Sequence, residues 1–240
     1  GMGASITNRD GQLPVTITGT ATPRACQHRS NVASAQIKSA ILLAGLNARG
    51  PTQITEPHPS RDHTESMLRY FGANVQQTFV DDGSHIISLQ GEAVLHSRQI
   101  NVPRDPSSAA FAIVAALITP DSDVMIPGIS INPLRTGLLK TLIEMGGSIE
   151  RVNERNEGGE VIADLRVKSS QLCGTEVPAS RAASMIDEYP ILSVAAAAAS
   201  GTTDMHGVAE LRLKETDRIK VLGVGLRECG VDVAYSDDSI

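Results

Sequence analysis

The chain has 240 residues, of which 41% are hydrophobic, 20% charged and only 2% aromatic. This is the balance of an ordinary globular protein whose core must be built from Ala, Val, Ile and Leu, since Trp is absent. A formal net charge of −6 lacks the basic footprint of nucleic-acid binding, although a few placed cations would still hold a small anion.

Membrane, secretory and metal-binding classes also find no support in the sequence. The longest apolar run, 191–199, is too short to span a bilayer, and no signal peptide opens the chain. The three Cys are far apart and form no CxxC pair, so reduced thiols in a cytoplasmic protein are expected. The six His are scattered without metal-ligand spacing, and we predict no metal site.

The first predicted elements form a βαβαββ unit. A strand over 13–19 precedes an Ala-rich apolar helix over 34–50, which is too long for a typical strand. A short β-like stretch at 52–57 follows, and then an amphipathic helix over 61–75. The segment 75–91 reads as a hairpin, because Asp82-Gly83 is a typical hairpin-turn dipeptide.

The same order of elements then recurs nearly twice. The second copy has strands at 98–103 and 123–128, helices at 107–120 and 134–150, and a hairpin over 150–169 that turns at Gly158-Gly159. The third has strands at 175–178 and 202–207, helices at 185–201 and 214–233, and a further strand from 231. A Gly suited to a helical C-cap ends each amphipathic helix, namely Gly72, Gly146 and Gly230.

Repeated units of alternating strands and helices predict an α/β or α+β fold. Each unit spans roughly 70–85 residues and the copies are not identical, so the chain is not a consensus solenoid. The third unit stops at Ser239-Ile240, where its closing hairpin is expected to begin, so the chain is predicted to be cut within a unit.

Several of these segments resemble one enzyme family closely. The resemblance is carried by the runs NVASAQIKSAILLAGL, EPHPSRDHTESMLRYFGANV, DPSSAAFAIVAALITP, SMIDEYPILSVAAAAASGTT and ELRLKETDRIKVLGVGLRECGV. The chain resembles 3-phosphoshikimate 1-carboxyvinyltransferases (EPSP synthases), and its sequence is most similar to the bacterial class II branch. The resemblance runs from about Leu13 to Val233 and identifies a central fragment. It implies the inside-out barrel fold of the family, with βαβαββ units in two domains. Residues 1–103 would hold the last unit of the first domain, and 104–240 two units of the second, the later one incomplete.

The family transfers the carboxyvinyl (enolpyruvyl) group of phosphoenolpyruvate to the 5-hydroxyl of shikimate 3-phosphate, in the route to aromatic amino acids, without a cofactor. Its substrates bind between the two domains. The resemblance implies that Ser34 and Ala35 contact the phosphate of shikimate 3-phosphate and that Gln36 lies between the substrates. A helix start suits this role because its free N–H groups bind anions. Arg61, at the start of the second helix, is implied to bind the same substrate.

The remaining implied site residues lie in the last unit. Asp187 matches the family's Asp that contacts the shikimate hydroxyls and is the candidate general base. Glu215 matches the candidate for proton exchange at C3 of phosphoenolpyruvate. Lys214 would contact shikimate 3-phosphate or assist proton transfer, and Arg218 would bind the phosphoenolpyruvate carboxylate. Because Lys214 and Arg218 are four residues apart, we expect them on one helical face, pointing at one anion.

Two departures from the family pattern bear on activity. Arg104 stands where the family usually has Gly, which removes the freedom to adopt a positive φ. Several cations that the family places around phosphoenolpyruvate have no match in the sequence, so we expect the chain alone to be inactive or nearly so. Apolar helices left without partners would favour a homo-oligomer.

Two other functions remain open. UDP-N-acetylglucosamine 1-carboxyvinyltransferases share the fold, but their reactive Cys has only Cys26 as a conceivable counterpart, and it precedes the helix at 34. A non-catalytic remnant that keeps a shikimate 3-phosphate half-site fits the sequence as well. Ligand binding without turnover would separate that remnant from an enzyme.

Overall fold

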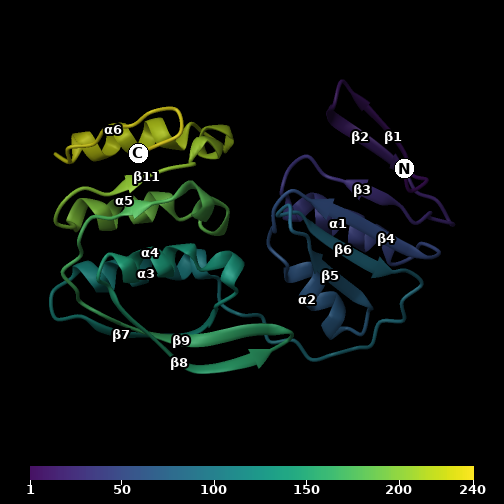
Figure 1. Cartoon of the computed structure of the whole chain (residues 1–240), viewed down its shortest axis with the longest axis horizontal. Coiled ribbons are helices and arrows are strands. Elements are labelled where there is room, and N and C mark those ends of the chain that lie inside the picture. The colour runs from purple at the N-terminus through teal and green to yellow at the C-terminus, as the bar shows by residue number, and fades with distance from the viewer. The chain divides into compact units, whose positions relative to one another are not determined.

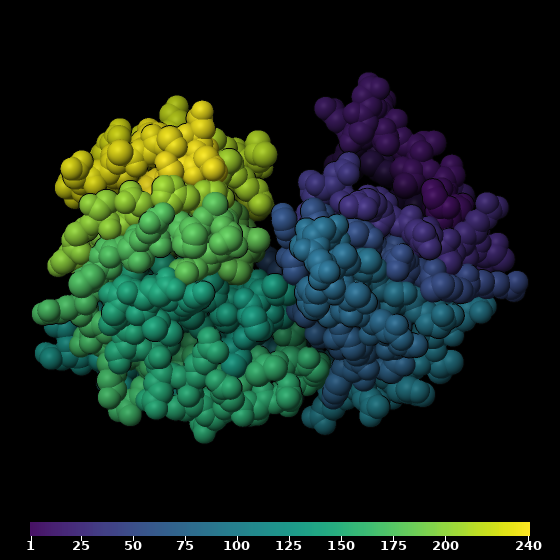
Figure 2. All heavy atoms as spheres, viewed as in Figure 1, coloured from purple at the N-terminus to yellow at the C-terminus, as the bar shows by residue number.

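The computed structural model describes residues 1–240, which divide into two compact units, Gly1–Ile100 and Asn101–Ile240 (Figure 1). Within each unit, the atoms of successive segments lie in contact on the face that Figure 2 shows. No helix is long and apolar enough to cross a membrane.

The first unit contains one complete βαβαββ arrangement. A four-stranded sheet has the order β3-β4-β6-β5, in which β3 and β4 run parallel and the other pairs antiparallel. Both helices pack against this sheet, and Leu42, Ile54 and Ile87 are fully buried between the layers. The elements are β3 (Gln27–Arg29), α1 (Ala35–Gly45), β4 (Pro51–Glu56), α2 (His63–Tyr70), β5 (Val75–Phe79) and β6 (His85–Gln90).

The strand predicted to lead this unit is placed elsewhere. Residues 13–19 fall mainly in β2 (Gln12–Thr18), which pairs only with β1 (Ser5–Arg9) as a separate antiparallel hairpin whose residues are all exposed. The strand beside β4 is the short β3, because the chain from Gln27 to Arg29 pairs with 53–55. The prediction of a strand at 13–19 is confirmed, but its sheet was wrong.

The second unit opens with the same arrangement. Its sheet has the order β7-β9-β8, and Arg104 adds a parallel bridge to Ile129 where β3 stands in the first unit. Leu142, Leu165 and Leu117 are fully buried between helices and sheet. The elements are α3 (Pro106–Ile118), β7 (Asp123–Ser130), η1 (Pro133–Arg135), α4 (Gly137–Glu144), β8 (Ser148–Glu157) and β9 (Glu160–Lys168).

The strand predicted over 98–103 does not form, and pairing begins only at Arg104. That residue donates its N–H to the Gly128 carbonyl and accepts from the Ser130 N–H. Arg104 is not among the residues with a positive φ, so its side chain is accommodated without backbone strain at this position.

The third arrangement is built of shorter pieces. β10 and β11 run parallel, and α5 packs against both α3 and α6 (Figure 1). The predicted strand after Gly230 does not form, and Ile240 instead exchanges backbone hydrogen bonds with Met205. The elements are β10 (Glu176–Val177), η2 (Ala179–Ser184), α5 (Tyr189–Ala198), β11 (Asp204–Met205), η3 (Ala209–Leu213) and α6 (Arg218–Glu228).

Turns and helix ends follow the sequence signals. Gly158 and Gly159 have φ of 61° and 84°, as a tight hairpin turn between β8 and β9 requires. The Gly predicted to follow each amphipathic helix also has a positive φ, which is 101° at Gly72, 93° at Gly146 and 84° at Gly230.

Candidate active site

The start of α1 has the predicted geometry. Ser34 is the N-cap, with an extended backbone and a side chain that accepts a hydrogen bond from the Ile37 N–H at 3.4 Å. The N–H groups of the first helical turn have no partner within the helix, so those of Ala35 and Gln36 are suited to an anion.

Arg61 lies outside the helix that it was predicted to begin. α2 starts at His63, with Asp62 as its N-cap, so Arg61 belongs to the irregular stretch 57–62 that follows β4. The helices α1 and α2 are joined by a hydrogen bond of 2.6 Å between the hydroxyls of Ser39 and Thr64. Arg61 and the Ser34 end of α1 are therefore presented by neighbouring elements of one unit.

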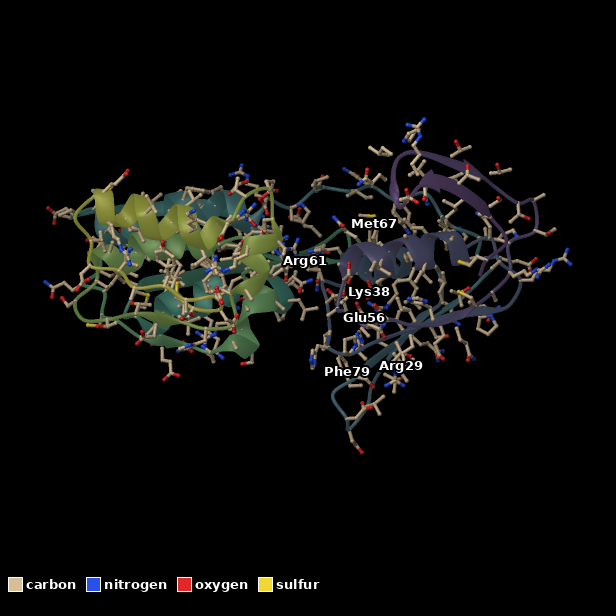
Figure 3. The ribbon with its side chains drawn as sticks, turned by 90° about the horizontal axis from the view of Figure 1, so that it is seen from above. Arg29, Lys38, Glu56, Arg61, Met67 and Phe79 are labelled. Carbon is tan, nitrogen blue, oxygen red and sulfur yellow. The ribbon has the colours of Figure 1, made fainter.

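A buried charge cluster, not predicted from the sequence, joins Lys38 to Glu56 near Arg61 (Figure 3). The Lys38 ammonium is 3.0 Å from Glu56 Oε2 and 2.8 Å from Glu65 Oε1, and all three side chains are at most 1% exposed. It also donates to the Ser60 carbonyl at 3.1 Å. Burial raises the pKa of Glu65 despite the opposing effect of Lys38. The sequence signal that could have indicated this cluster is Lys38, a charged residue inside an otherwise apolar helix.

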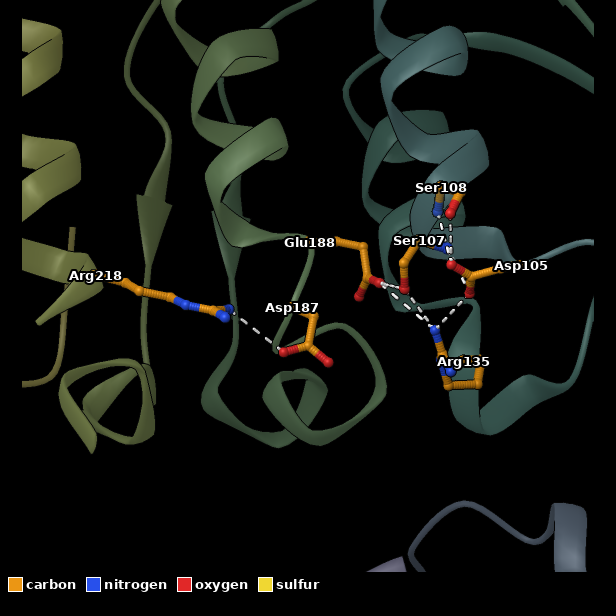
Figure 4. Close-up of polar contacts among 7 residues, drawn as sticks. All are labelled: Asp105, Ser107, Ser108, Arg135, Asp187, Glu188 and Arg218. Atoms are coloured by element: carbon orange, nitrogen blue, oxygen red, sulfur yellow. Dashed lines mark hydrogen bonds and ion pairs between the residues drawn. The ribbon is translucent and has the colours of Figure 1, made fainter. Parts of the chain in front are cut away.

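In the second unit the structure brings Asp187, Glu215 and Arg218 together, and Figure 4 shows the contact between Asp187 and Arg218. Arg218 Nη1 is 3.5 Å from Asp187 Oδ1, and Arg218 Nη2 donates to Glu215 Oε2 at 2.5 Å. Asp187 lies two residues before α5, whereas Arg218 is the first residue of α6. Carboxylates from two separate segments thus share one guanidinium.

Lys214 and Arg218 do not share a helical face, so that prediction was wrong. Asp217 is the N-cap of α6, where its side chain accepts from the Lys220 N–H at 3.1 Å, and the helix begins only at Arg218. Lys214 ends η3 in an extended conformation, and its ammonium donates to Glu210 Oε1 at 2.6 Å. A side-chain cap within the predicted helix separates the two cations.

The electrostatics favour an ionised Glu215. A hydrogen bond from its own backbone, and then the hydrogen bond and charge of Arg218, lower the pKa of Glu215. The side chain is 77% exposed, so the carboxylate remains open to solvent while it contacts the guanidinium. Glu215 is therefore ionised at neutral pH.

A second polar network, which was also not predicted from the sequence, adjoins Asp187 (Figure 4). Asp105 caps α3 by accepting from the N–H groups of Ser107 and Ser108. Arg135 Nη2 donates to Ser107 Oγ at 2.5 Å and to Asp105 Oδ1 at 3.2 Å, and lies 3.8 Å from Glu188 Oε1. Ser107 in turn donates to Glu188. The network ties the residue after Asp187 to the start of α3.

Burial works against the ionised form of Asp105, but the hydrogen bonds from Ser108 and Ser107 and the charge of Arg135 outweigh it and lower the pKa of Asp105. No group of three or more His, Cys, Asp or Glu side chains is placed to hold a metal ion. A surface hollow of about 690 Å³ in the second unit is lined by Lys140, Arg151 and parts of η1, α4 and η2, but by none of the predicted site residues.

The βαβαββ arrangements define a mixed α/β protein in which Arg side chains lie beside carboxylates at helix starts. The family model described as EPSP synthase (3-phosphoshikimate 1-carboxyvinyltransferase) matches residues 1–240. The chain belongs to this family.

Individual relatives agree. The chain is 55% identical to a 3-phosphoshikimate 1-carboxyvinyltransferase of Parvibaculum lavamentivorans and 55% identical to one of Methylorubrum populi, over 99% and 100% of its length. It superposes on an EPSP synthase structure from Acinetobacter baumannii with a TM-score of 0.88 and 46% identity over 99% of the chain. The alignments cover 53% and 54% of the two relatives and 53% of the solved chain, so this chain spans about half of their length.

Proposed function

We propose that the chain takes part in the transfer of the carboxyvinyl group from phosphoenolpyruvate to the 5-hydroxyl of shikimate 3-phosphate, which yields EPSP and phosphate. The family membership supports this, and one structural observation carries the assignment of residues. Arg218 contacts Asp187 and Glu215 at once, so a cation for a substrate carboxylate stands beside two groups able to exchange protons.

The reaction moves two protons in the addition and one in the elimination. In the addition, the 5-oxygen bonds to C2 of phosphoenolpyruvate, its proton passes to a base, and C3 gains a proton. In the elimination, C3 loses a proton and the bond from C2 to the phosphate oxygen breaks. We assign the base to Asp187 and the exchange at C3 to Glu215, whose carboxylate is 77% exposed and so open to a substrate. Lys214 would contact shikimate 3-phosphate or assist a proton transfer.

The other site residues would bind the anionic groups of the two substrates or lie beside them. The first-turn N–H groups at Ser34 and Ala35 would hold the phosphate of shikimate 3-phosphate, with Gln36 toward the second substrate. Arg61 would bind the first substrate and Arg218 the carboxylate of phosphoenolpyruvate, because a planar guanidinium donates two parallel hydrogen bonds to such groups.

Isothermal titration of the purified chain tests these roles, first with shikimate 3-phosphate and then with phosphoenolpyruvate added. Arg61→Ala should weaken the first binding about 100-fold, as the loss of a charge-assisted hydrogen bond of about 2–3 kcal/mol requires. Arg218→Ala should abolish the heat of the second titration and leave the first unchanged.

Arg49→Ala is the matched control, since Arg49 lies in the same unit and its side chain is 85% exposed. It should leave both titrations unchanged. A folded chain that gives no heat with either ligand would contradict the proposal. An equal loss of binding in the Arg49 and Arg61 variants would show that only general charge attraction operates.

A further inference from the structure

The Lys38 ammonium joins three segments of the first unit at a buried point. From its place on α1 it reaches Glu56 at the end of β4, Glu65 on α2, and the backbone carbonyl of Ser60 between them. Lys38, Glu56 and Glu65 are at most 1% exposed, so solvent does not weaken these contacts.

This junction adjoins both parts of the site proposed for shikimate 3-phosphate. Lys38 follows Ser34 by four residues, which places it one helical turn further on the same face of α1. Ser60 immediately precedes Arg61, and it is held twice. Its carbonyl accepts from Lys38 at 3.1 Å, and its hydroxyl donates to Glu56 Oε1 at 2.6 Å.

The stretch 57–62 needs such contacts because it belongs to no helix or strand. An Arg that binds a phosphate must be held within about 0.5 Å of its productive position, and a stretch without ladder hydrogen bonds does not provide this by itself. The two contacts of Ser60 restrain the backbone directly beside Arg61.

Stability alone is a poor explanation for the cluster. Taking one ammonium and two carboxylates out of water is costly, and replacing buried ion pairs with apolar side chains is often neutral or stabilising. The cluster holds two carboxyl groups for one ammonium, and Glu65 bears the cost of burial in a raised pKa. What the arrangement does provide is a fixed geometry between α1, β4, α2 and the stretch 57–62.

We propose that Lys38 is a positioning residue for shikimate 3-phosphate, which fixes the backbone before Arg61 against the helix that begins at Ser34. This inference rests on the proposed function, since it assumes that Ser34 and Arg61 bind one substrate. Lys38 acts through Arg61 and does not touch the ligand.

Titration of the 240-residue chain with shikimate 3-phosphate tests the coupling. Lys38→Met, which keeps the length of the side chain, should weaken binding about tenfold, the effect of a displacement of a few tenths of an ångström. The double variant Lys38→Met/Arg61→Ala should bind no more weakly than Arg61→Ala alone, because the effect of Lys38 passes through Arg61. The proposal would be overturned if the two substitutions weakened binding independently, so that their effects multiplied in the double variant. It would also be overturned if folded Lys38→Met bound shikimate 3-phosphate as tightly as the wild-type chain.

Ser60→Ala provides a second route, because Lys38→Met leaves two buried carboxyl groups without their cation and so threatens the fold of the unit. This variant keeps all three charges and removes only the hydrogen bond to Glu56. It should weaken binding by a smaller factor than Lys38→Met, again with no further loss when Arg61→Ala is added. Circular dichroism checks that each variant is folded.

Amide hydrogen exchange over residues 57–62 separates this inference from the proposed function. Ser60→Ala should speed exchange in that stretch without changing it in β5 or β6, and wild-type exchange rates would overturn the role of the cluster whatever the binding result. Failure of the wild-type chain to bind shikimate 3-phosphate would instead overturn the function on which the substrate assignment rests.

Discussion

Loss of the Arg135 side chain should destabilise the second unit strongly. The guanidinium is 13% exposed and the Glu188 carboxyl beside it 5%. Removing one partner of a fully buried ion pair costs about 3–5 kcal/mol, because the other charge is left uncompensated. Glu188 keeps its hydrogen bond from Ser107, so Arg135→Ala should cost less, about 2–3 kcal/mol.

Urea unfolding followed by far-ultraviolet circular dichroism measures this loss. The matched control is Arg166→Ala, in which a guanidinium of the same unit loses two hydrogen bonds to Asp123. Both partners there are more than 40% exposed, so the loss should be far smaller. Equal losses in the two variants would refute the reasoning from burial. The double variant Arg135→Met/Glu188→Gln should recover most of the lost stability, since it removes the uncompensated charge.

Three further predictions concern stability. Burial, followed by the charge of Lys38, lowers the pKa of His85, so the stabilising contribution of His85 is complete above pH about 6.5 and is lost as the pH falls. His85→Gln should flatten this loss in the free energy of unfolding, measured with urea between about pH 7 and 5. An unchanged slope of that free energy against pH would contradict the prediction. Leu142→Ala should cost about 3 kcal/mol in the core, whereas Ile143→Ala, at a position 45% exposed on the same helix, should cost under about 1 kcal/mol. Gly225→Ala in α6 meets no atom within 4 Å and should raise the stability by about 0.5–1 kcal/mol. Gly174→Ala would bring a Cβ to 2.0 Å from the Thr202 carbonyl and should lower thermal stability, the opposite sign.

Features set by local chemistry could be predicted from the sequence. A turn at Gly158-Gly159 and the ends of the amphipathic helices depend on backbone conformations that Gly adopts readily, so a few residues suffice to place them. The start of α1 likewise follows from Ser34 as its N-cap. These positions, together with the repeat of strands and helices, account for most of the fold.

Features that depend on distant partners could not be predicted. The stretch 13–19 has the pattern of a strand, but nothing in it says whether it pairs with β1 or with β4. The Arg135 network joins positions as far as 81 residues apart, from Ser107 to Glu188, and no spacing rule reaches so far. Lys38 was visible as a lone charge in an apolar helix, but its two partners lie on β4 and α2.

The break before α6 has a consequence for the charges of the candidate site. In one continuous helix Lys214 and Arg218 would be like charges four residues apart, an unfavourable arrangement. The cap at Asp217 separates them, so that Lys214 pairs with Glu210 while Arg218 contacts Asp187 and Glu215. A cation at the first position of a helix also opposes the helix dipole, and the two carboxylates offset that cost. Helix stability therefore does not explain why Arg218 stands at this position, whereas the binding of a substrate carboxylate proposed for it does.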